Sequence, residues 1–254
     1  MAARPVTDIF DVYFGKPALM IGGGPSARVD LPRLEEAGFA PGVVISANQH
    51  GFYQGHYKID FIVNVDKLHC ALRRPMEEYL RPFGVPIINQ HTWADYRLID
   101  WKFTANSGIT AVAVCCMLGA WPVVVTGCDL FGTGRKYFHD ADMKNKAPRP
   151  KTGPPSHYAL QRMKELQRWS NNYPIRPVSG PLADIFPAWS PEETFERPRA
   201  VPYRSDMLNR RVAAYRALRS HTFRPNDTVQ EGEVLHLSFA EAKAGLDKKW
   251  LVAV

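Results

Sequence analysis

Three consecutive glycines follow a short apolar run near the start of the chain, in the segment 18–30. Without a Cβ at a turn, the backbone can adopt positive φ and approach a ligand closely. A helix that begins near Ser26 would direct its free amide groups and its dipole to the same point, which favours an anion. Gly22–Gly24 and Ser26 therefore predict a phosphate cradle, and the alternative is a tight strand-to-helix turn without a ligand. The spacing matches neither the dinucleotide fingerprint nor the Walker loop.

Polar residues also follow the other predicted strands. They are Asn48, Asn64, Asp66 and Asp129. The carboxyl ends of parallel strands meet at one edge of a sheet, where ligands usually bind. Two roles suit Asp66 and Asp129. They could hydrogen-bond amide groups of their turns, as Asp often does, or they could hold Mg²⁺ together with substrate phosphates.

Apolar runs of strand length alternate with segments of helical pattern along the first 190 residues. The expected strands cover 18–21, 42–47, 61–65, 85–89, 122–126 and 175–178, and the expected helices cover 31–37, 76–81, 107–118 and 157–169. The segment 107–118 is apolar on nearly all sides, which is typical of a buried helix. This alternation predicts a doubly wound α/β fold with a mostly parallel, Rossmann-like sheet.

Residues 131–156 are rich in Gly, Pro, Lys and Arg and have no apolar periodicity. A loop of this length within a compact domain is usually functional or disordered. Its six Lys and Arg residues within 135–151 predict a basic lid beside an anionic acceptor, and a solvated loop is the alternative. The formal net charge of +7 also suits an anionic partner. Nucleic acid is one such partner, although no base-reading motif supports it.

A Pro-rich, charged stretch divides the chain after residue 190. We expect an α/β domain over 1–190, a linker over 191–206 and a small β-plus-helix module over 207–254. The expected elements of this module are helices at 207–220 and 239–246 and strands at 234–237 and 250–254. A module of this kind would serve docking or the formation of a homo-oligomer.

The four cysteines lie in or beside apolar runs and lack the spacing of metal ligands. They indicate buried thiols in a reducing compartment. No segment has the apolar length of a signal peptide or of a membrane span. We therefore expect a cytoplasmic protein.

Three segments carry a resemblance to a known family. They are IGGGPS with ISANQ downstream, then NSGITAVAVCCMLGAWPVVVTGCDLF, then Tyr137 followed by PSHYALQRMKELQRW. In this order they resemble the bacterial sialyltransferases of glycosyltransferase family 42. The resemblance covers residues 18–190, about two thirds of the chain. It implies a Rossmann-like fold and transfer of a sugar from a nucleotide-sugar donor to an acceptor hydroxyl.

The resemblance also implies roles for individual residues. Gly22, Gly24, Ser26 and Asn48 would hold the phosphate and sugar of the donor, and Asn64, Ser107 and Gly108 would line the nucleotide pocket. His157 would act as the general base that accepts the proton of the acceptor hydroxyl, while the acceptor oxygen attacks the anomeric carbon with inversion. Tyr137 would hydrogen-bond to the departing phosphate, so that no metal or other cofactor is required.

Three positions depart from the pattern of this family. Phe131 stands in place of a second tyrosine, Gly23 in place of an asparagine and Thr104 in place of an arginine. Each change removes a polar contact to the donor or to the leaving group, so a donor other than CMP-sialic acid is an alternative. Two other classes stay open. One is a Mg²⁺-dependent enzyme similar to the 6-hydroxymethylpterin diphosphokinase-like proteins, and the other is a non-catalytic, phage or virion-associated binding protein.

Overall fold

The computed structural model describes residues 3–68, 74–98, 106–129 and 173–196, four positions within 161–167, and the backbone of five strands within 212–253. The chain divides into two compact units. One contains residues 1–9, 86–102 and 202–254, and the other contains residues 10–85 and 103–201. The predicted division into a domain at 1–190, a linker at 191–206 and a module at 207–254 stays a prediction.

The described helices and strands have the following bounds. The α-helices are α1 (Ala27–Glu36), α2 (Met76–Leu80) and α3 (Ser107–Met117), and the 3-10 helices are η1 (Val6–Ile9), η2 (His50–Tyr53), η3 (Arg81–Phe83) and η4 (Pro181–Asp184). The strands are β1 (Arg4–Pro5), β2 (Ala18–Ile21), β3 (Val43–Ala47), β4 (Phe61–Val63), β5 (Ile87–Asn89), β6 (Tyr96–Arg97), β7 (Val123–Thr126), β8 (Ile175–Pro177), β9 (Val212–Ala217), β10 (His221–Arg224), β11 (Asp227–Val229), β12 (Val234–Ser238) and β13 (Leu251–Ala253).

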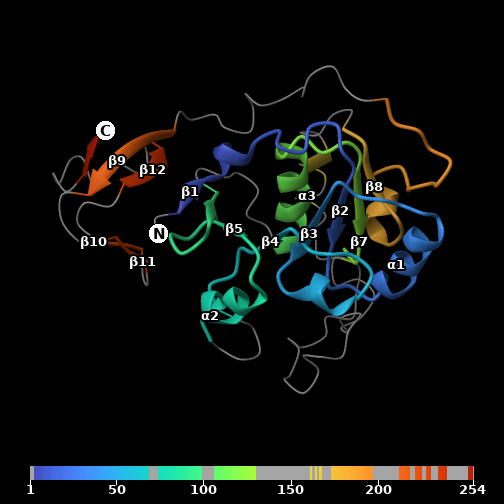
Figure 1. Ribbon diagram of the computed structural model, residues 1–254, viewed down its shortest axis with the longest axis horizontal. Helices are drawn as coiled ribbons and strands as arrows, with labels where there is room; N and C mark the ends of the chain where they lie inside the picture. The colour runs from blue at the N-terminus through green and yellow to red at the C-terminus, as the bar shows by residue number, and fades with distance from the viewer. Residues whose placement is uncertain are drawn as a thin grey trace. The chain divides into compact units, whose positions relative to one another are not determined.

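Eight of these strands form one sheet, in the order β1-β6-β5-β4-β3-β2-β7-β8 (Figure 1). In its centre, β2 pairs in parallel with β3 on one side and with β7 on the other. Ile21, for example, lies beside Ser46 and Thr126. The turns that follow β2, β3 and β7 therefore leave the sheet at the same edge. These pairings confirm the predicted α/β fold with a parallel, Rossmann-like sheet.

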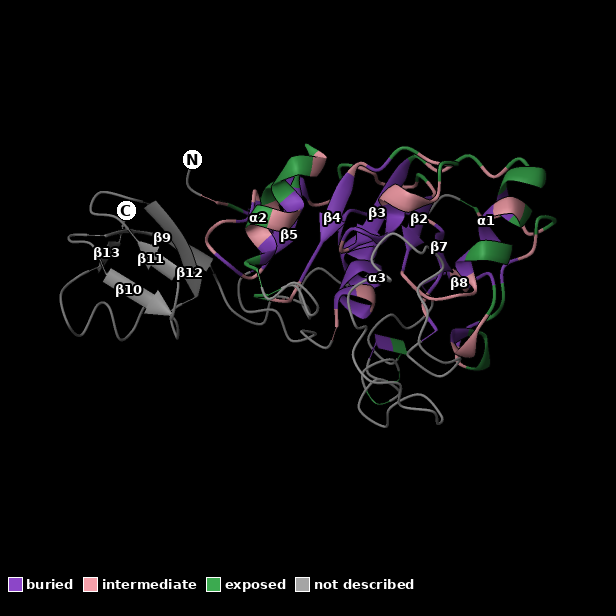
Figure 2. Ribbon diagram, turned by 90° about the horizontal axis from the view of Figure 1, so that it is seen from below, coloured by how far each residue is buried: buried purple, intermediate pink, exposed green. Residues whose placement is uncertain are grey.

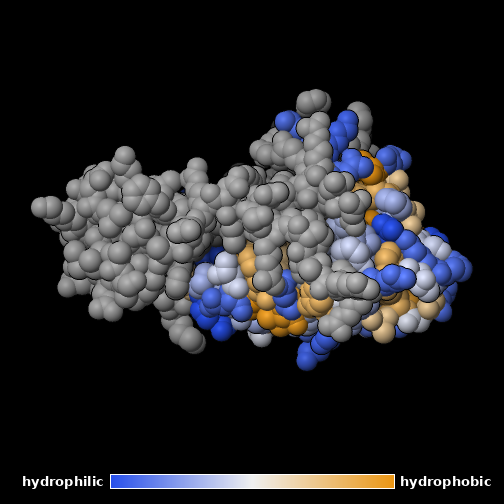
Figure 3. Space-filling view, turned by 90° about the horizontal axis from the view of Figure 1, so that it is seen from above, coloured by the Kyte–Doolittle hydropathy of each residue, from blue (hydrophilic) through white to orange (hydrophobic). Residues whose placement is uncertain are grey.

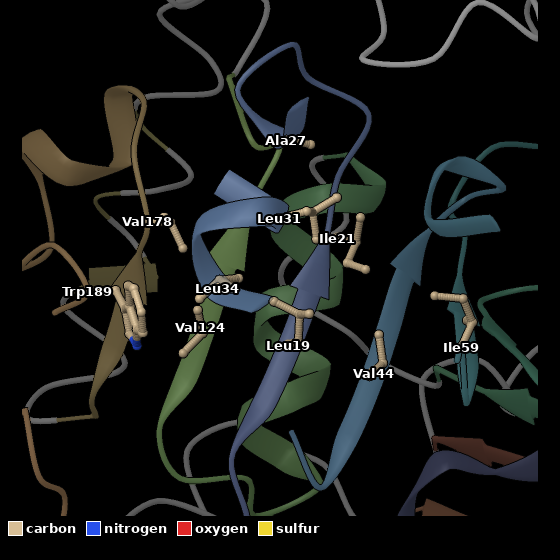
Figure 4. Packing of buried hydrophobic residues seen from close by; sticks show 10 residues of the cluster. All are labelled: Leu19, Ile21, Ala27, Leu31, Leu34, Val44, Ile59, Val124, Val178 and Trp189. Atoms are coloured by element: carbon tan, nitrogen blue, oxygen red, sulfur yellow. The ribbon is translucent and has the colours of Figure 1, made fainter. Parts of the chain in front are cut away.

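Helices cover both faces of the central strands. Leu31 and Leu34 of α1 pack in one cluster with Leu19 of β2 and Val124 of β7, and in Figure 4 α1 lies in front of the strands with α3 behind them. Every residue of α3 except Gly108 is buried, as the helix drawn in purple in Figure 2 shows. Apolar burial on this scale is the main force that holds the layers together. It also confirms the predicted buried helix.

The predicted helix at 207–220 is wrong. Val212–Ala217 form β9, which pairs antiparallel with β12 and with β13 in a three-stranded sheet. Val and Tyr residues favour strands, and pairing on both sides outweighs the helix propensity of the Ala and Arg residues in the same segment. The predicted strands at 234–237 and 250–254 are confirmed, whereas the helix predicted at 239–246 lies outside the described residues.

The described surface mixes polar and apolar residues. Among the described residues, the exposed large hydrophobic ones are Val12, Val29 and Leu68, which come from three different parts of the sequence. On the face in Figure 3, hydrophilic and hydrophobic residues alternate over the described part. Among the residues described, no helix combines the length and the apolar character that a membrane crossing requires.

Candidate functional site

The glycine turn after β2 packs directly against the turn after β7. The amide of Gly22 donates to the carbonyl of Thr126 at 2.8 Å, and the amide of Gly24 donates to the carbonyl of Gly127 at 2.7 Å. A Cβ at Gly22 would overlap the carbonyl oxygen of Gly127. Gly127 itself has a φ of +64°, in the left-handed region that favours glycine. Close backbone contact between two turns therefore accounts for glycine at positions 22 and 127.

The carboxylate of Asp129 lies against the glycine turn at Gly24 and Ser26. Its Oδ2 accepts a hydrogen bond from the amide of Ser26 at 3.0 Å, and a Cβ at Gly24 would overlap the same carboxylate. Asp129 is 3% exposed. It therefore supplies the negative charge that the first turn of α1 favours, and it fills the first of the two roles expected for an Asp in this position. The phosphate cradle predicted at Gly22–Gly24 stays a prediction.

A second buried carboxylate, Asp30, lies one turn along α1. Its two oxygens accept hydrogen bonds from Oγ1 of Thr126 at 3.0 Å and from Oγ of Ser179 at 2.7 Å. Burial raises the pKa of Asp30, the two hydroxyl donors oppose this rise, and the nearby charge of Asp129 adds to it. The two carboxylates join the ends of β2, β7 and β8 to α1.

A chain of polar side chains joins the ends of β3 and β4 to the start of α3. Nδ2 of Asn64 donates to Oδ1 of Asn48 at 2.7 Å, and Nδ2 of Asn48 donates to Oδ2 of Asp66 at 3.4 Å. Oγ of Ser107 donates to the same carboxylate oxygen at 3.4 Å and accepts from the amide of Val65 at 3.2 Å. We call Asn48, Asn64, Asp66 and Ser107 the strand-end relay. It brings together four of the predicted site residues.

The direction of the relay follows from Asp66. An ionised carboxylate only accepts hydrogen bonds, so Asn48 must turn its amide nitrogen to Asp66 and its oxygen to Asn64. Asn64 then uses its nitrogen on Asn48. Its Oδ1 is left buried without a hydrogen-bond partner among the described residues, and Asn64 is 0% exposed. An unpaired buried acceptor of this kind is costly, and a ligand hydroxyl or amino group would satisfy it.

The backbone at Asn48 is also unusual. Its φ of +55° lies in the left-handed region, which Asn tolerates better than most residues. Oγ of Ser46 donates to the carbonyl of Asn48 at 2.7 Å and accepts from the amide of Gly51 at 2.8 Å. The side chain of Ser46 therefore holds the turn that presents Asn48 to the relay.

The start of α3 lies beside the relay. The Asn106 side chain accepts from the amide of Ile109 at 2.8 Å and so caps the helix. A Cβ at Gly108 would meet Oδ1 of Asn106 and Sγ of Cys128 at 3.4 Å, an ordinary contact. Packing does not require glycine at position 108, and its role in lining a pocket stays a prediction.

Among the described cysteines, the thiol nearest these turns is not activated by ionisation. Cys115, Cys116 and Cys128 are free. Burial raises the pKa of Cys128 to about 12, and the charge of Asp129 adds to the rise. The nucleophilic form of cysteine is the thiolate, so Cys128 is a neutral packing group at physiological pH. The described residues contain no group of three or more His, Cys, Asp or Glu side chains that could hold a metal ion.

Several predicted residues lie outside the described part of the chain. His157 and Tyr137 are among them, as are the basic segment 131–156 and the departures Phe131 and Thr104. Their roles stay predictions.

Sequence reasoning missed several residues that shape the glycine turn or support the strand-end relay. They are Asp30, Ser46, Asn106, Thr126, Ser179 and Gly180. Asn106 was detectable, because Asn directly before an apolar helical segment is a typical cap. Ser179 was not, because its partner Asp30 is 149 positions away in the chain.

Comparisons with protein families, with curated proteins and with solved structures find no match for this chain.

Proposed function

We propose that the protein is a sialyltransferase-like glycosyltransferase that transfers a sugar from a nucleotide-sugar donor to an acceptor hydroxyl. One observation of the structure carries the binding part of this proposal. The Oδ1 of Asn64 is a buried acceptor without a described partner, and it ends a relay at the carboxyl ends of two parallel strands. Ligands of open α/β sheets bind at this edge.

The relay suits the nucleoside part of a donor. A ribose hydroxyl or a base amino group can donate to Asn64 Oδ1, and these are the groups that phosphate and most anions lack. The first turn of α3, an eleven-residue helix, begins at Ser107 within the relay. Its dipole favours a phosphate group nearby. The chemistry of the relay therefore supports a nucleotide more than a bare sugar or a lipid.

The catalytic steps of the proposal come from the resemblance. His157 would accept the proton of the acceptor hydroxyl as its oxygen bonds to the anomeric carbon. The bond from that carbon to the donor phosphate would break with inversion, and Tyr137 would donate a hydrogen bond to the departing phosphate. The basic segment 131–156 would favour an anionic acceptor, of which nucleic acid is one class.

A second candidate function rests on Asp66. This carboxylate is partly exposed at the end of β4, and both of its described donors are at the long distance of 3.4 Å. Mg²⁺ is usually bound by one or two carboxylates together with substrate phosphates. A Mg²⁺-dependent diphosphokinase would therefore use Asp66 as a metal ligand, whereas a metal-independent glycosyltransferase would use it only to orient Asn48.

A thermal-shift panel with CMP, UDP, GDP and ATP derivatives, each with Mg²⁺ or with EDTA, tests the proposal. Binding raises the melting temperature by mass action. We expect a nucleotide-dependent shift that persists in EDTA, and sugar transfer from the matching nucleotide sugar that also persists. A shift that requires Mg²⁺ would favour the diphosphokinase. If no nucleotide shifts the melting temperature, the glycosyltransferase proposal fails and a non-catalytic binding protein is favoured.

Two matched variants sharpen this comparison. Asp66→Asn removes the charge at the carboxyl end of β4 but keeps an acceptor for Asn48 and Ser107. Asp60→Asn makes the same change at the amino end of the same strand, where Asp60 accepts from the amide of Val44 at 2.8 Å. We expect both variants to keep EDTA-resistant nucleotide binding. Loss of binding in Asp66→Asn alone, together with a Mg²⁺ requirement in the unaltered protein, would contradict the metal-independent mechanism.

A further inference from the structure

A second buried polar cluster lies at the ends of β5 and β6 and uses none of the relay residues. Asn89 ends β5 and pairs in parallel register with Arg97, which ends β6. Residues that pair in this way project from the same face of a sheet. Asn89 is 0% exposed and Arg97 is 3% exposed. A permanently charged guanidinium and a carboxamide are therefore buried side by side.

The amide group of Asn89 is only half satisfied. Its Oδ1 accepts from the backbone amide of His91 at 2.6 Å, which identifies the oxygen. Its Nδ2 must then be the other terminal atom, and this nitrogen is buried without a hydrogen-bond partner among the described residues. A buried donor without an acceptor is costly, so an acceptor from outside the described chain would stabilise it.

Arg97 and His91 are both neighbours of Asn89, through strand pairing and through a backbone hydrogen bond. Nε of Arg97 donates to the carbonyl of Gln90 at 3.3 Å, which draws the guanidinium across the end of β5 next to Asn89. His91 lies in the turn that follows β5 and is 4% exposed. Its ring stacks on Trp93, with ring centroids 6.0 Å apart and an interplanar angle of 14°. Asn89 thus lies beside a cationic residue in the sheet and is hydrogen-bonded to the backbone of a residue whose imidazole stacks on an indole.

The acidic residue closest in sequence to this cluster, Asp95, accepts a hydrogen bond at the start of β5. Its Oδ2 accepts from the amide of Ile87 at 2.8 Å. An acceptor that suits both a guanidinium and an amide nitrogen is an oxyanion, because its oxygens accept from several donors at once. We propose that Asn89, His91 and Arg97 form a binding site for a small oxyanion, which is either a carboxylate or a phosphate group.

The substitution Asn89→Asp tests this site with almost no change in shape. It keeps the oxygen that accepts from His91, and it replaces the Nδ2 atom by a carboxylate oxygen beside Arg97. The variant therefore carries its own anion in the place of the ligand. We expect it to melt at a higher temperature than the unaltered protein without added oxyanion, and to lose the response to oxyanions.

The measurement is a thermal melt of the full chain in sodium chloride, sodium phosphate and sodium acetate at equal ionic strength. We expect the unaltered protein to melt higher in phosphate than in chloride, and a shift in acetate would identify a carboxylate site as well. Lys58→Gln lowers the net charge by the same one unit at an exposed position before β4, away from both polar clusters. This control should keep the full phosphate response.

Three outcomes would overturn the site. Asn89→Asp would melt lower than the unaltered protein if a protein oxygen accepts from Nδ2. It would respond to phosphate as strongly as the unaltered protein if the anion binds elsewhere, for example with the strand-end relay. A phosphate response lost equally in Lys58→Gln would show that the change in net charge alone is responsible.

Discussion

Two buried carboxylates, Asp30 and Asp129, join the start of α1 to the segments that follow β7 and β8. Asp129 accepts from the amide of Ser26, and Asp30 accepts from Thr126 and Ser179. Each carboxylate must therefore keep its position for the turn to keep its shape. Of the two, Asp30 is the carboxylate whose pKa makes the stability of the fold depend on pH.

The raised pKa of Asp30 gives a stability that depends on pH. Its pKa lies above the ordinary value of 3.8 in the folded protein, chiefly because of burial. The folded state then binds this proton more tightly than the unfolded state does, so the contribution is favourable at acid pH and is lost as pH rises through the folded value. We expect Asp30→Asn to lack this pH-dependent loss. The free energy of unfolding of the variant should therefore increase relative to that of the unaltered protein as pH rises.

Urea unfolding of both proteins at a series of pH values from 4 to 8 measures this difference. Asn keeps an acceptor for one hydroxyl, and the other hydroxyl can rotate to accept from its amide nitrogen. Two parallel curves of unfolding free energy against pH would contradict a raised pKa at Asp30.

At the scale of elements, the turn after β2 depends on the absence of side chains at particular positions. A Cβ at Gly24 would overlap the carboxylate of Asp129 and lie 2.8 Å from the carbonyl oxygen of Gly127. Overpacking of this kind typically costs about 1–3 kcal/mol. We therefore expect Gly24→Ala to lower the free energy of unfolding by about this amount.

Gly108→Ala is the matched control in the first turn of α3. Its Cβ would make only ordinary contacts at 3.4 Å, and Ala favours a helix over Gly by about 1 kcal/mol. Chemical denaturation of both variants should show destabilisation for Gly24→Ala and a neutral or stabilising effect for Gly108→Ala. Equal destabilisation by the two changes would contradict the packing described for the glycine turn.

Most elements of the central sheet could be predicted from the sequence. Continuous apolar runs such as Val123–Thr126 form strands because both faces of the sheet are covered. The turn glycines ended β2 at the expected residue. In contrast, the two-residue strands β1 and β6 have no pattern of their own, because two residues cannot show a period. The helix predicted at 207–220 was wrong, because the pairing of Val212–Ala217 with β12 and β13 cannot be seen in the local sequence.

At the scale of the whole molecule, the candidate site is assembled by contacts that span long stretches of sequence. Ser26 meets Asp129 across 103 positions, and Asp66 meets Ser107 across 41. The sequence identified polar residues after each strand, but it could not show that Asp129 points into the glycine turn while Asp66 joins the relay. Those directions depend on the order of strands in the sheet, which places β7 next to β2 and β4 next to β3.

Asn64 is the residue through which the proposed donor-binding function can be tested most directly. Asn64→Leu removes the unpaired acceptor, together with the donor to Asn48, while it keeps a side chain of similar size. Loss of a hydrogen bond to a buried group costs about 1–3 kcal/mol, so the dissociation constant should rise about 5- to 150-fold. Tyr173→Phe serves as the control. It removes a buried hydroxyl, located before the start of β8, whose acceptors are the carbonyl oxygens of Ala120 and Cys116.

The decisive measurement is isothermal titration of the nucleotide that gives the largest thermal shift into the unaltered protein, Asn64→Leu and Tyr173→Phe, with each variant first shown to be folded. The proposal predicts that the dissociation constant is about 5- to 150-fold higher for Asn64→Leu, which corresponds to the free energy of one lost hydrogen bond. It predicts an unchanged dissociation constant for Tyr173→Phe. Unchanged nucleotide affinity in a folded Asn64→Leu variant would contradict binding of the donor at the strand-end relay.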